Sequence, residues 1–156
     1  MQVDTPAMLE LRDVCLFYGG MQALRGVSLR VAKGEIVALL GTNGAGKTST
    51  LNAIAGATPV KKGEILFSGE RIDGLTPERL VEAGISLVPE RRRLFPSMSV
   101  LDNLILGAYR RFRKDDKREI ERDLSLVFEL FPILKERVGQ PSGTLSGGQQ
   151  QMVAVG

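Results

Sequence analysis

One run of eight residues constrains this chain more than any other segment: Gly41-Thr42-Asn43-Gly44-Ala45-Gly46-Lys47-Thr48. It matches the pattern G-x-x-x-x-G-K-[ST] at every fixed position. Glycines let backbone N–H groups curl around an anionic phosphate, and the helix that follows points its positive end at the same charge. Lys47 can reach the outer phosphates, and the Thr48 hydroxyl can ligate Mg²⁺. We therefore expect this loop to bind a nucleoside triphosphate, ATP above all, together with Mg²⁺.

The segments before and after the loop are also of the kinds that phosphate binding by this loop requires. Ile36 to Leu40 is a continuous apolar run, typical of a strand buried on both faces. Residues 48–55 have helical spacing, and Gly56 with Pro59 ends that pattern. The loop alone leaves three classes open, because transport ATPases, GTPases and small-molecule kinases all use it.

Other periodicities predict an α/β core that begins with an antiparallel β part and carries a helical insert at about residues 97–150. Two strands surround the turn Tyr18-Gly19-Gly20 as a hairpin. Thr76 and Pro77 predict the cap and first position of a helix, and Ser146 opens the last helix. The hairpin strands are expected at residues 9–17 and 24–31, and a third strand at residues 63–67. A second buried strand is expected at residues 85–88 and the helical region at residues 100–134.

Composition and charge narrow the class of protein. The 156 residues are 43% hydrophobic and 25% charged, which fits one soluble globular domain. No stretch approaches the roughly 20 apolar residues of a membrane span, and the first residues lack the features of a secretory signal. The lone Cys15 fits a reducing cytosol and is expected to be a buried structural thiol.

The net charge of +3 is modest, and two basic runs carry much of it. Arg91 to Arg93 contains no aromatic residue, and Arg110 to Lys114 contains one, Phe112, rather than the series of aromatic residues that stacks on successive bases. The second run is followed at once by two aspartates, as on a solvated surface. Nucleic acid is therefore not an expected partner.

A second motif is Leu145-Ser146-Gly147-Gly148-Gln149. Ser146 can cap the helix that begins here, and the amides of Gly147 and Gly148 then form an anion-binding N-terminus. An ordinary helix cap would not explain two glycines just inside the helix, because each costs about 1 kcal/mol relative to alanine. Close approach to a ligand does explain them.

These five residues are the signature sequence of ATP-binding cassette (ABC) proteins, and the chain resembles an ABC ATPase over essentially its whole length. The resemblance implies a homo- or heterodimer with a second ATPase subunit, in which the signature of one subunit closes on the γ-phosphate held by the other. It also implies that Tyr18 stacks on adenine, where the alternative is an ordinary hairpin or core tyrosine. The residues expected to bind ATP are Tyr18, Gly41, Asn43, Gly44, Ala45, Gly46, Lys47, Thr48 and Ser49.

Glu90 departs from the general family pattern, which has glutamine at this strand end. Leu87-Val88-Pro89-Glu90 is similar instead to the branched-chain amino acid importers, although Arg91 replaces their usual glycine. The segments 17–24 and 75–77 resemble the same branch. On this resemblance Glu90 is a second Mg²⁺ ligand beside Thr48, and the alternative is a surface glutamate.

The resemblance also implies partners and a location. The helical insert after Phe95 would meet integral membrane permease subunits, with a solute-binding protein as an indirect partner. The location would be cytoplasmic, peripheral on the inner face of the cell membrane. Arg91 to Arg93 would lie near the permease contact or in a merely solvated loop.

Hydrolysis in this family needs an apolar-Asp-Glu strand and a later switch histidine. This sequence ends at Gly156 inside the signature helix and contains no histidine. We therefore expect the chain to lack the C-terminal part of the core, to have no catalytic residue of its own and to be inactive in hydrolysis alone. Segments 36–40 and 85–88 would then expose unpaired strand edges. The alternatives are a module that binds ATP without hydrolysing it and a non-transport ABC ATPase.

Overall fold

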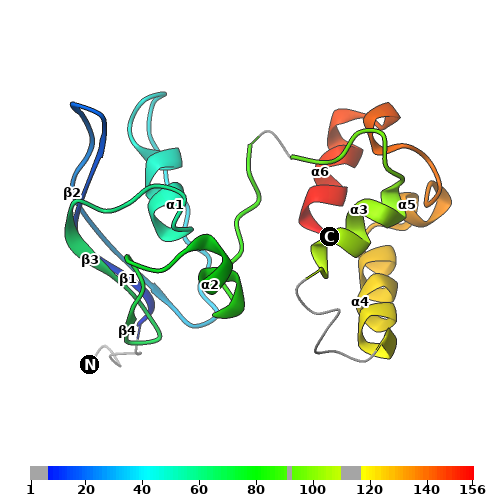
Figure 1. Cartoon of the computed structure of the whole chain (residues 1–156), viewed down its shortest axis with the longest axis horizontal. Coiled ribbons are helices and arrows are strands. Elements are labelled where there is room, and N and C mark those ends of the chain that lie inside the picture. The colour runs from blue at the N-terminus through cyan, green and yellow to red at the C-terminus, as the bar shows by residue number, and fades with distance from the viewer. Residues whose placement is uncertain (1–6, 91–92, 110–116) are drawn as a thin grey trace. The chain divides into compact units, whose positions relative to one another are not determined.

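A four-stranded antiparallel sheet dominates the first part of the chain in the computed structural model, which describes residues 7–90, 93–109 and 117–156. The strands are β1 (Ala7–Tyr18), β2 (Met21–Ala32), β3 (Lys62–Phe67) and β4 (Glu70–Arg71), in the order β2-β1-β3-β4 (Figure 1). Leu11 in β1 pairs with Leu29 on one side and Ile65 on the other. The predicted hairpin and third strand are confirmed.

Chain contacts divide the protein into two compact units, and each is described by itself. The first unit is Met1–Leu87 and the second unit is Val88–Gly156. Besides the sheet, the first unit contains the helices α1 (Lys47–Ile54) and α2 (Pro77–Glu82). Thr76 is the N-cap of α2 as predicted, but its side chain makes no capping hydrogen bond.

The core of the first unit is aliphatic and joins both helices to the sheet. Ala53 of α1 and Leu80 of α2 are buried with residues from β1, β2 and β3. The complete set of buried core residues is Leu11, Val14, Leu16, Leu24, Ala53, Ile65, Ile72 and Leu80. Because this core holds α1 in place, the loop that precedes α1 leads into a fixed helix.

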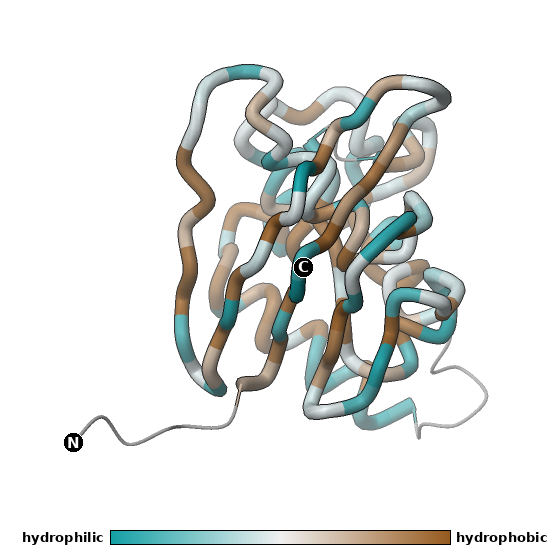
Figure 2. Tube along the Cα trace, turned by 90° about the vertical axis from the view of Figure 1, so that its left-hand side faces the viewer, coloured by the Kyte–Doolittle hydropathy of each residue, from teal (hydrophilic) through white to brown (hydrophobic). Residues whose placement is uncertain are grey.

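The two predicted buried strands are wrong for this structure. The segments 36–40 and 85–88 form no strand in the described part of the chain. Ile36 is 97% exposed and Leu40 is 91% exposed, and their segment runs as a separate hydrophobic trace in Figure 2. A strand needs a hydrogen-bonded neighbour, and no described strand supplies one here. The exposure itself agrees with the expectation of uncovered apolar edges.

The second unit is helical in its described residues. It contains α3 (Val100–Gly107), α4 (Lys117–Leu130), α5 (Pro132–Glu136), a 3₁₀ turn η1 (Ser142–Thr144) and α6 (Gly147–Val155). Its buried core is Val100, Leu104, Leu134, Leu145 and Val153. Ser146 is the N-cap of α6, which confirms the predicted start of the last helix.

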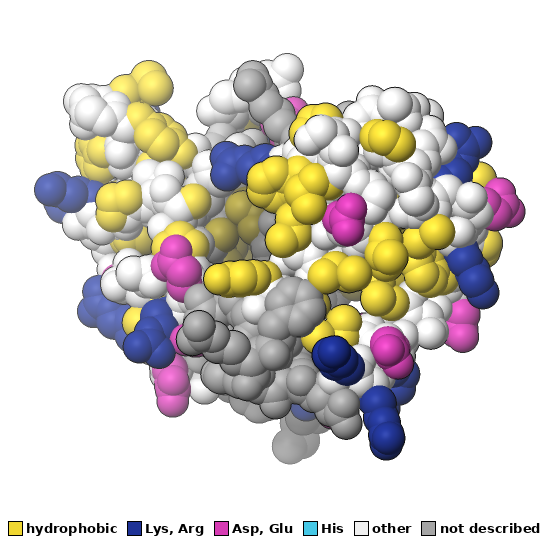
Figure 3. Space-filling view, turned by 45° about the vertical axis from the view of Figure 1, so that its right-hand side comes forward, with side chains coloured by type: hydrophobic (Ala, Val, Ile, Leu, Met, Phe, Trp, Pro, Cys, Tyr) yellow, Lys and Arg dark blue, Asp and Glu magenta, His cyan; other side chains and the backbone are white. Residues whose placement is uncertain are grey.

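Large hydrophobic side chains stay open to solvent in both units. Figure 3 shows such side chains in yellow on one face, among charged ones. Besides Ile36 and Leu40, examples are Tyr109 at 71% and Phe95 at 57% exposure. Arg91, Arg92 and Arg110 to Lys114 lie outside the described residues, so the predictions about the basic runs stay predictions.

Candidate functional site

The loop Gly41 to Thr48 has the backbone that its glycines were expected to supply. Gly44 has φ +87° and Gly46 has φ +94°, a region that residues with a Cβ rarely adopt. A Cβ on Gly46 would also lie 2.8 Å from Leu24 Cδ2 and 3.2 Å from the Ala23 carbonyl oxygen. Gly46 therefore serves two purposes: it turns the loop into α1, and it lets β2 approach the loop closely.

Lys47 is directed over the loop that precedes it. Its Nζ donates to the carbonyl oxygens of Gly41 and Thr42, both at 2.8 Å. Two carbonyl contacts hold the ammonium group at the loop without neutralising its charge. A phosphate in the loop would meet a cation that is already positioned.

The start of α1 leaves donors available for an anion. Its N-cap is Gly46, no side chain caps it, and its first turn has no acidic residue. The first N–H groups of a helix have no partner inside the helix. Thr48 is exposed and Ser49 half-buried in this first turn. Together these groups offer backbone N–H donors and two hydroxyls beside Lys47, a donor set suited to a phosphate and its cation.

Tyr18 ends β1 beside the same helix. Its side chain is 42% exposed, so Tyr18 is not a core residue. The polar side chains of Thr58, then Asn52 and Ser49, hold the pKa of the Tyr18 phenol below its ordinary value.

The signature motif is built differently. Ser146 Oγ accepts from the Gln149 N–H at 3.4 Å, and Gln149 Oε1 accepts from the Ser146 N–H at 3.1 Å. This reciprocal pair is a capping box. The Leu145 side chain is 6% exposed and belongs to the second core, so it anchors the motif. The first turn of α6 has no acidic residue, so its positive end stays open to an anion.

A polar network behind the signature was not predicted. Ser142, fully buried, donates from Oγ to the Phe95 carbonyl oxygen at 2.9 Å. Asn103 Nδ2 donates to Ser142 Oγ at 3.2 Å, and Asn103 Oδ1 accepts from the Phe95 N–H at 2.8 Å. Gln150 in α6 donates to the Ser142 carbonyl oxygen at 3.1 Å. The network joins the loop at Phe95 to the signature helix, and no sequence periodicity marks it.

Metal-binding candidates are sparse in the described ranges. No group of three or more Asp, Glu, Cys or His side chains is arranged there to hold a metal ion. Glu90 is exposed and belongs to the second unit, whereas Thr48 belongs to the first. Their sharing of one Mg²⁺ ion therefore stays a prediction.

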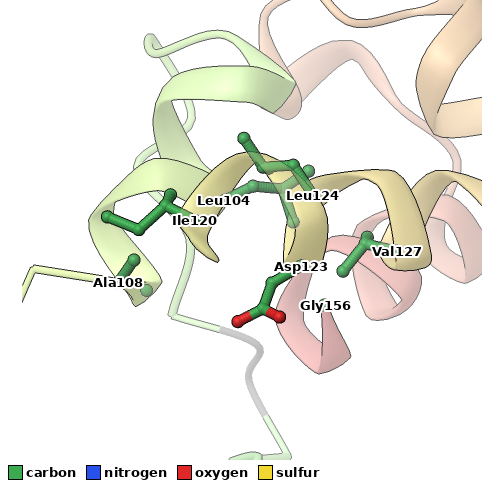
Figure 4. Close-up of a pocket in the computed structure, with 8 residues that line it drawn as sticks. Leu104, Ala108, Ile120, Asp123, Leu124, Val127 and Gly156 are labelled. Carbon is green, nitrogen blue, oxygen red and sulfur yellow. The ribbon is translucent and has the colours of Figure 1, made fainter. Parts of the chain in front are cut away.

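A small pocket of about 130 Å³ lies in the second unit, between α3, α4 and the end of α6. Figure 4 shows Leu104, Ile120, Leu124 and Val127 around it, with the Asp123 carboxylate at its edge. Its lining residues lie outside both the loop and the signature. This pocket is a gap between packed helices and is separate from the candidate site.

Comparison with known proteins decides the family. The family model for the ABC transporter matches residues 24–156, which include both the loop and the signature. The chain belongs to the ABC transporter family. Its α/β fold is that of an ABC ATPase cassette, because solved cassettes superpose on almost all of it.

Two curated members of the ABC transporter family show how far the similarity reaches. The chain is 44% identical over 149 residues to the high-affinity branched-chain amino acid transport ATP-binding protein BraG of Pseudomonas aeruginosa, covering 96% of this chain and 62% of BraG. It is 34% identical over 158 residues to the phosphate import ATP-binding protein PstB of Tropheryma whipplei, covering 96% and 61%. The chain therefore spans about three fifths of the length of these relatives.

A solved ABC cassette has the same architecture. The dimeric post-hydrolysis structure of the cassette MJ0796 bound to ADP and Pi superposes with a TM-score of 0.81 at 26% identity. The match covers 95% of this chain and 67% of that one. In the described residues of this ABC family member, no helix is long and apolar enough to cross a bilayer.

Proposed function

We propose that this chain supplies the ATP-binding and signature parts of an importer's ATPase subunit. In this proposal, ATP binding and hydrolysis at a head-to-tail dimer interface drive uptake of a small solute. One observation carries it: in this member of the ABC transporter family, the loop and the signature each lead into a helix without an acidic first turn, and Lys47 is positioned at the loop.

Each site residue has a proposed role. The loop glycines and the amides at the start of α1 surround the β-phosphate, and Lys47 neutralises the outer phosphates. Thr48 and Glu90 would hold Mg²⁺, which supplies charge neutralisation of the transferring phosphate. Tyr18 stacks on adenine, for which its 42% exposure leaves ring surface available. Ser146 to Gly148 contact the γ-phosphate held by the partner subunit.

Branched-chain amino acids are the proposed solute. The 44% identity to BraG exceeds the 34% identity to the phosphate importer PstB, and the Pro89-Glu90 sequence favours the same branch. The solute itself would contact permease and solute-binding subunits, with the ATPase subunit peripheral at the inner face of the cell membrane. The proposed substrate therefore rests on relatedness and not on a solute pocket in this chain.

Hydrolysis by these 156 residues alone is not expected. The sequence has neither the family's apolar-Asp-Glu strand after the signature nor a histidine. The second candidate function is accordingly an ATP–Mg²⁺-binding module without turnover. Phosphate release from the purified chain separates the two, because turnover above the rate of a Lys47→Ala variant would contradict the module.

Calorimetric titration with ATP, with and without Mg²⁺, tests the binding proposal directly. We expect saturable binding that Mg²⁺ strengthens, and GTP should bind more weakly than ATP. Absence of ATP binding by a folded chain would overturn the proposal.

Two chimeras test the solute. In one, this chain replaces the matching 149 residues of BraG; in the other, it replaces the matching segment of PstB. Cells that depend on each chimera are assayed for uptake of leucine and of phosphate. Restored leucine uptake with little phosphate uptake supports the proposal, whereas the reverse pattern would contradict it.

A further inference from the structure

The side-chain amide of Asn103, in α3, pairs with both backbone groups of Phe95. Asn103 Oδ1 accepts from the Phe95 N–H at 2.8 Å, and Nδ2 donates to the Phe95 carbonyl oxygen at 3.1 Å. The same Nδ2 lies 2.9 Å from the Ser99 carbonyl oxygen and 3.2 Å from Ser142 Oγ. A side-chain amide can do this because it carries an acceptor and two N–H donors. Asn103 therefore holds the segment 95–99 on α3 through both of its polar atoms.

Ser142 continues this link toward the signature, which begins three residues later. Ser142 is fully buried. Its N–H donates to the Met98 carbonyl oxygen at 2.9 Å, and its Oγ donates to the Phe95 carbonyl oxygen at 2.9 Å. Its own carbonyl oxygen accepts from Nε2 of Gln150, in α6, at 3.1 Å. Each polar atom of this buried residue thus has a partner, and these partners lie in the segment 95–99 on one side and in the signature helix on the other.

Gly143 brings the same two segments into contact at the level of the backbone. Its N–H donates to the Pro96 carbonyl oxygen at 2.9 Å. A Cβ added to Gly143 would lie 2.9 Å from Pro96 Cβ and 3.0 Å from the Pro96 carbonyl oxygen. These distances are shorter than ordinary van der Waals contact, so a side chain at Gly143 would push the segments apart. This close approach is independent of the side-chain hydrogen bonds of Asn103 and Ser142.

We propose that Asn103 and Ser142 are positioning residues for the signature Leu145 to Gln149. The proposal rests on the proposed role of the signature at the γ-phosphate of the partner subunit, and it assigns the residues that set the position of that signature. The capping box orders the first turn of α6 from within, whereas this network fixes that turn relative to α3. Donors that are held in place before binding lose less conformational freedom when the partner's phosphate arrives.

Amide hydrogen exchange of the full chain tests the positioning without any ligand. Asn103→Leu keeps the approximate size of the side chain and removes its hydrogen bonds. We expect exchange of the Gln149 and Gln150 amides to become about fivefold faster, while exchange in α4 changes little. Ser99→Ala is the matched control, because it removes the cap of the same helix α3 and leaves the Asn103 amide in place. Equal acceleration in both variants, or throughout the second unit, would show that the network only supports the fold and would overturn the inference.

A milder variant guards against loss of folding. Ser142→Ala removes only the buried hydroxyl, and we expect exchange of the Gln149 and Gln150 amides to become about threefold faster. The double variant with Asn103→Leu should exchange no faster than Asn103→Leu alone, because both changes break one shared link. Fully multiplicative effects would contradict that link.

ATP-dependent dimer formation tests the consequence for the partner site, measured by sedimentation with the chain grafted into BraG. Asn103→Leu and Gly143→Ala should each weaken the dimer by about threefold to fivefold. Gly139→Ala is the control for Gly143→Ala, because an added Cβ there meets nothing within 4 Å, and it should leave the dimer unchanged. ATP affinity of the single chain should stay the same in all three variants, since the loop lies in the first unit.

The possible failures can be told apart. Faster exchange at Gln149 and Gln150 with an undiminished dimer would overturn the inference, because the position of the signature would then have no effect on the partner site. Weaker ATP binding by the single chain in Asn103→Leu would also overturn it, since the variant would then act on the loop. Absence of an ATP-dependent dimer in the graft without substitutions would instead contradict the proposed function, while the exchange rates still decide whether the network holds the signature.

Discussion

The loop at Gly41 to Thr48 and the signature at Leu145 to Gln149 both lead into a helix N-terminus, but the two N-termini are built differently. Each presents a helix N-terminus without an acidic residue in the first turn, as the five-residue α5 also does, whereas α2, α3 and α4 carry Glu78, Asp102 and Glu119 there. The loop has no side-chain cap and depends on positive φ angles. The signature has a complete capping box and a buried polar network behind it.

This difference indicates what each element contributes. The loop has no side-chain cap, so the first N–H groups of α1 are available to a ligand, and its glycines adopt φ angles that a residue with a Cβ rarely adopts. In the signature, the capping box pairs the Ser146 and Gln149 amides and Leu145 anchors the motif, so the start of α6 is held in place before a ligand binds. The loop should therefore respond strongly to changes of backbone or charge, and the signature should respond mainly to loss of its cap.

The largest expected effect comes from replacing a positive-φ glycine of the loop. Gly46→Ala places a Cβ at φ +94° against Leu24 and should destabilise the first unit by about 3 kcal/mol, from backbone strain plus overpacking. Gly34→Ala is the matched control, because Gly34 has φ +78° with open space around it and should cost only about 1 kcal/mol. Urea unfolding and amide exchange in β1 and β2 measure both. Equal costs would mean that the contact with β2 is irrelevant.

The second-largest effect is expected when the positive charge at the loop is removed. Lys47→Ala should weaken ATP binding by about 10-fold to 100-fold, because a charge-assisted contact to phosphate is lost. Lys33→Ala removes an exposed lysine from the same unit and should leave the affinity unchanged. Titration calorimetry compares the variants. If Lys33→Ala weakened binding as much, only the net charge of the unit would matter.

The capping boxes give a smaller and more selective effect. Ser146→Ala and Ser99→Ala each remove the cap of a helix in the second unit and should each cost about 1 kcal/mol of stability in urea. Only Ser146→Ala should reduce ATP-dependent dimer formation, measured by sedimentation with the chain grafted into BraG. A similar loss of dimer in Ser99→Ala would show that the signature cap has no special role.

The smallest expected effect lies away from both elements, at Asp73. Burial raises the pKa of its carboxyl, but hydrogen bonds from the Arg71 guanidinium and the Ile65 N–H outweigh this, and the net pKa is lowered. A lowered folded pKa stabilises the protein above the unfolded value of about 3.9 and loses this contribution as pH falls through the folded value. Asp73→Asn should cost at most about 1 kcal/mol at pH 7.

The pH dependence of that cost is the measurement. The stability gap between the wild type and Asp73→Asn, taken from urea unfolding, should be constant above about pH 5 and shrink below about pH 4. Since Asp73 is remote from the loop in sequence and bonding, ATP affinity at pH 7 should not change. A gap that grew in acid would contradict the lowered pKa.

Local sequence signals determined much of this protein. The glycine pattern, the cap at Ser146, the hairpin and the helices follow from interactions within a few residues, and the described structure contains them at nearly the predicted bounds. The strands expected at residues 36–40 and 85–88 did not form, because an apolar run specifies a buried strand only when a neighbour pairs with it.

By itself, the sequence determined where helices are capped and predicted which segments bind phosphate, because both kinds of signal are encoded in consecutive residues. Only the tertiary structure decided that Lys47 rests on the Gly41 and Thr42 carbonyl oxygens and that Gly46 lies against Leu24. It also decided that Asn103 and Ser142 connect Phe95 to the signature. These contacts join residues up to 47 positions apart, and such pairings depend on how the cores pack and leave no periodic trace in the chain.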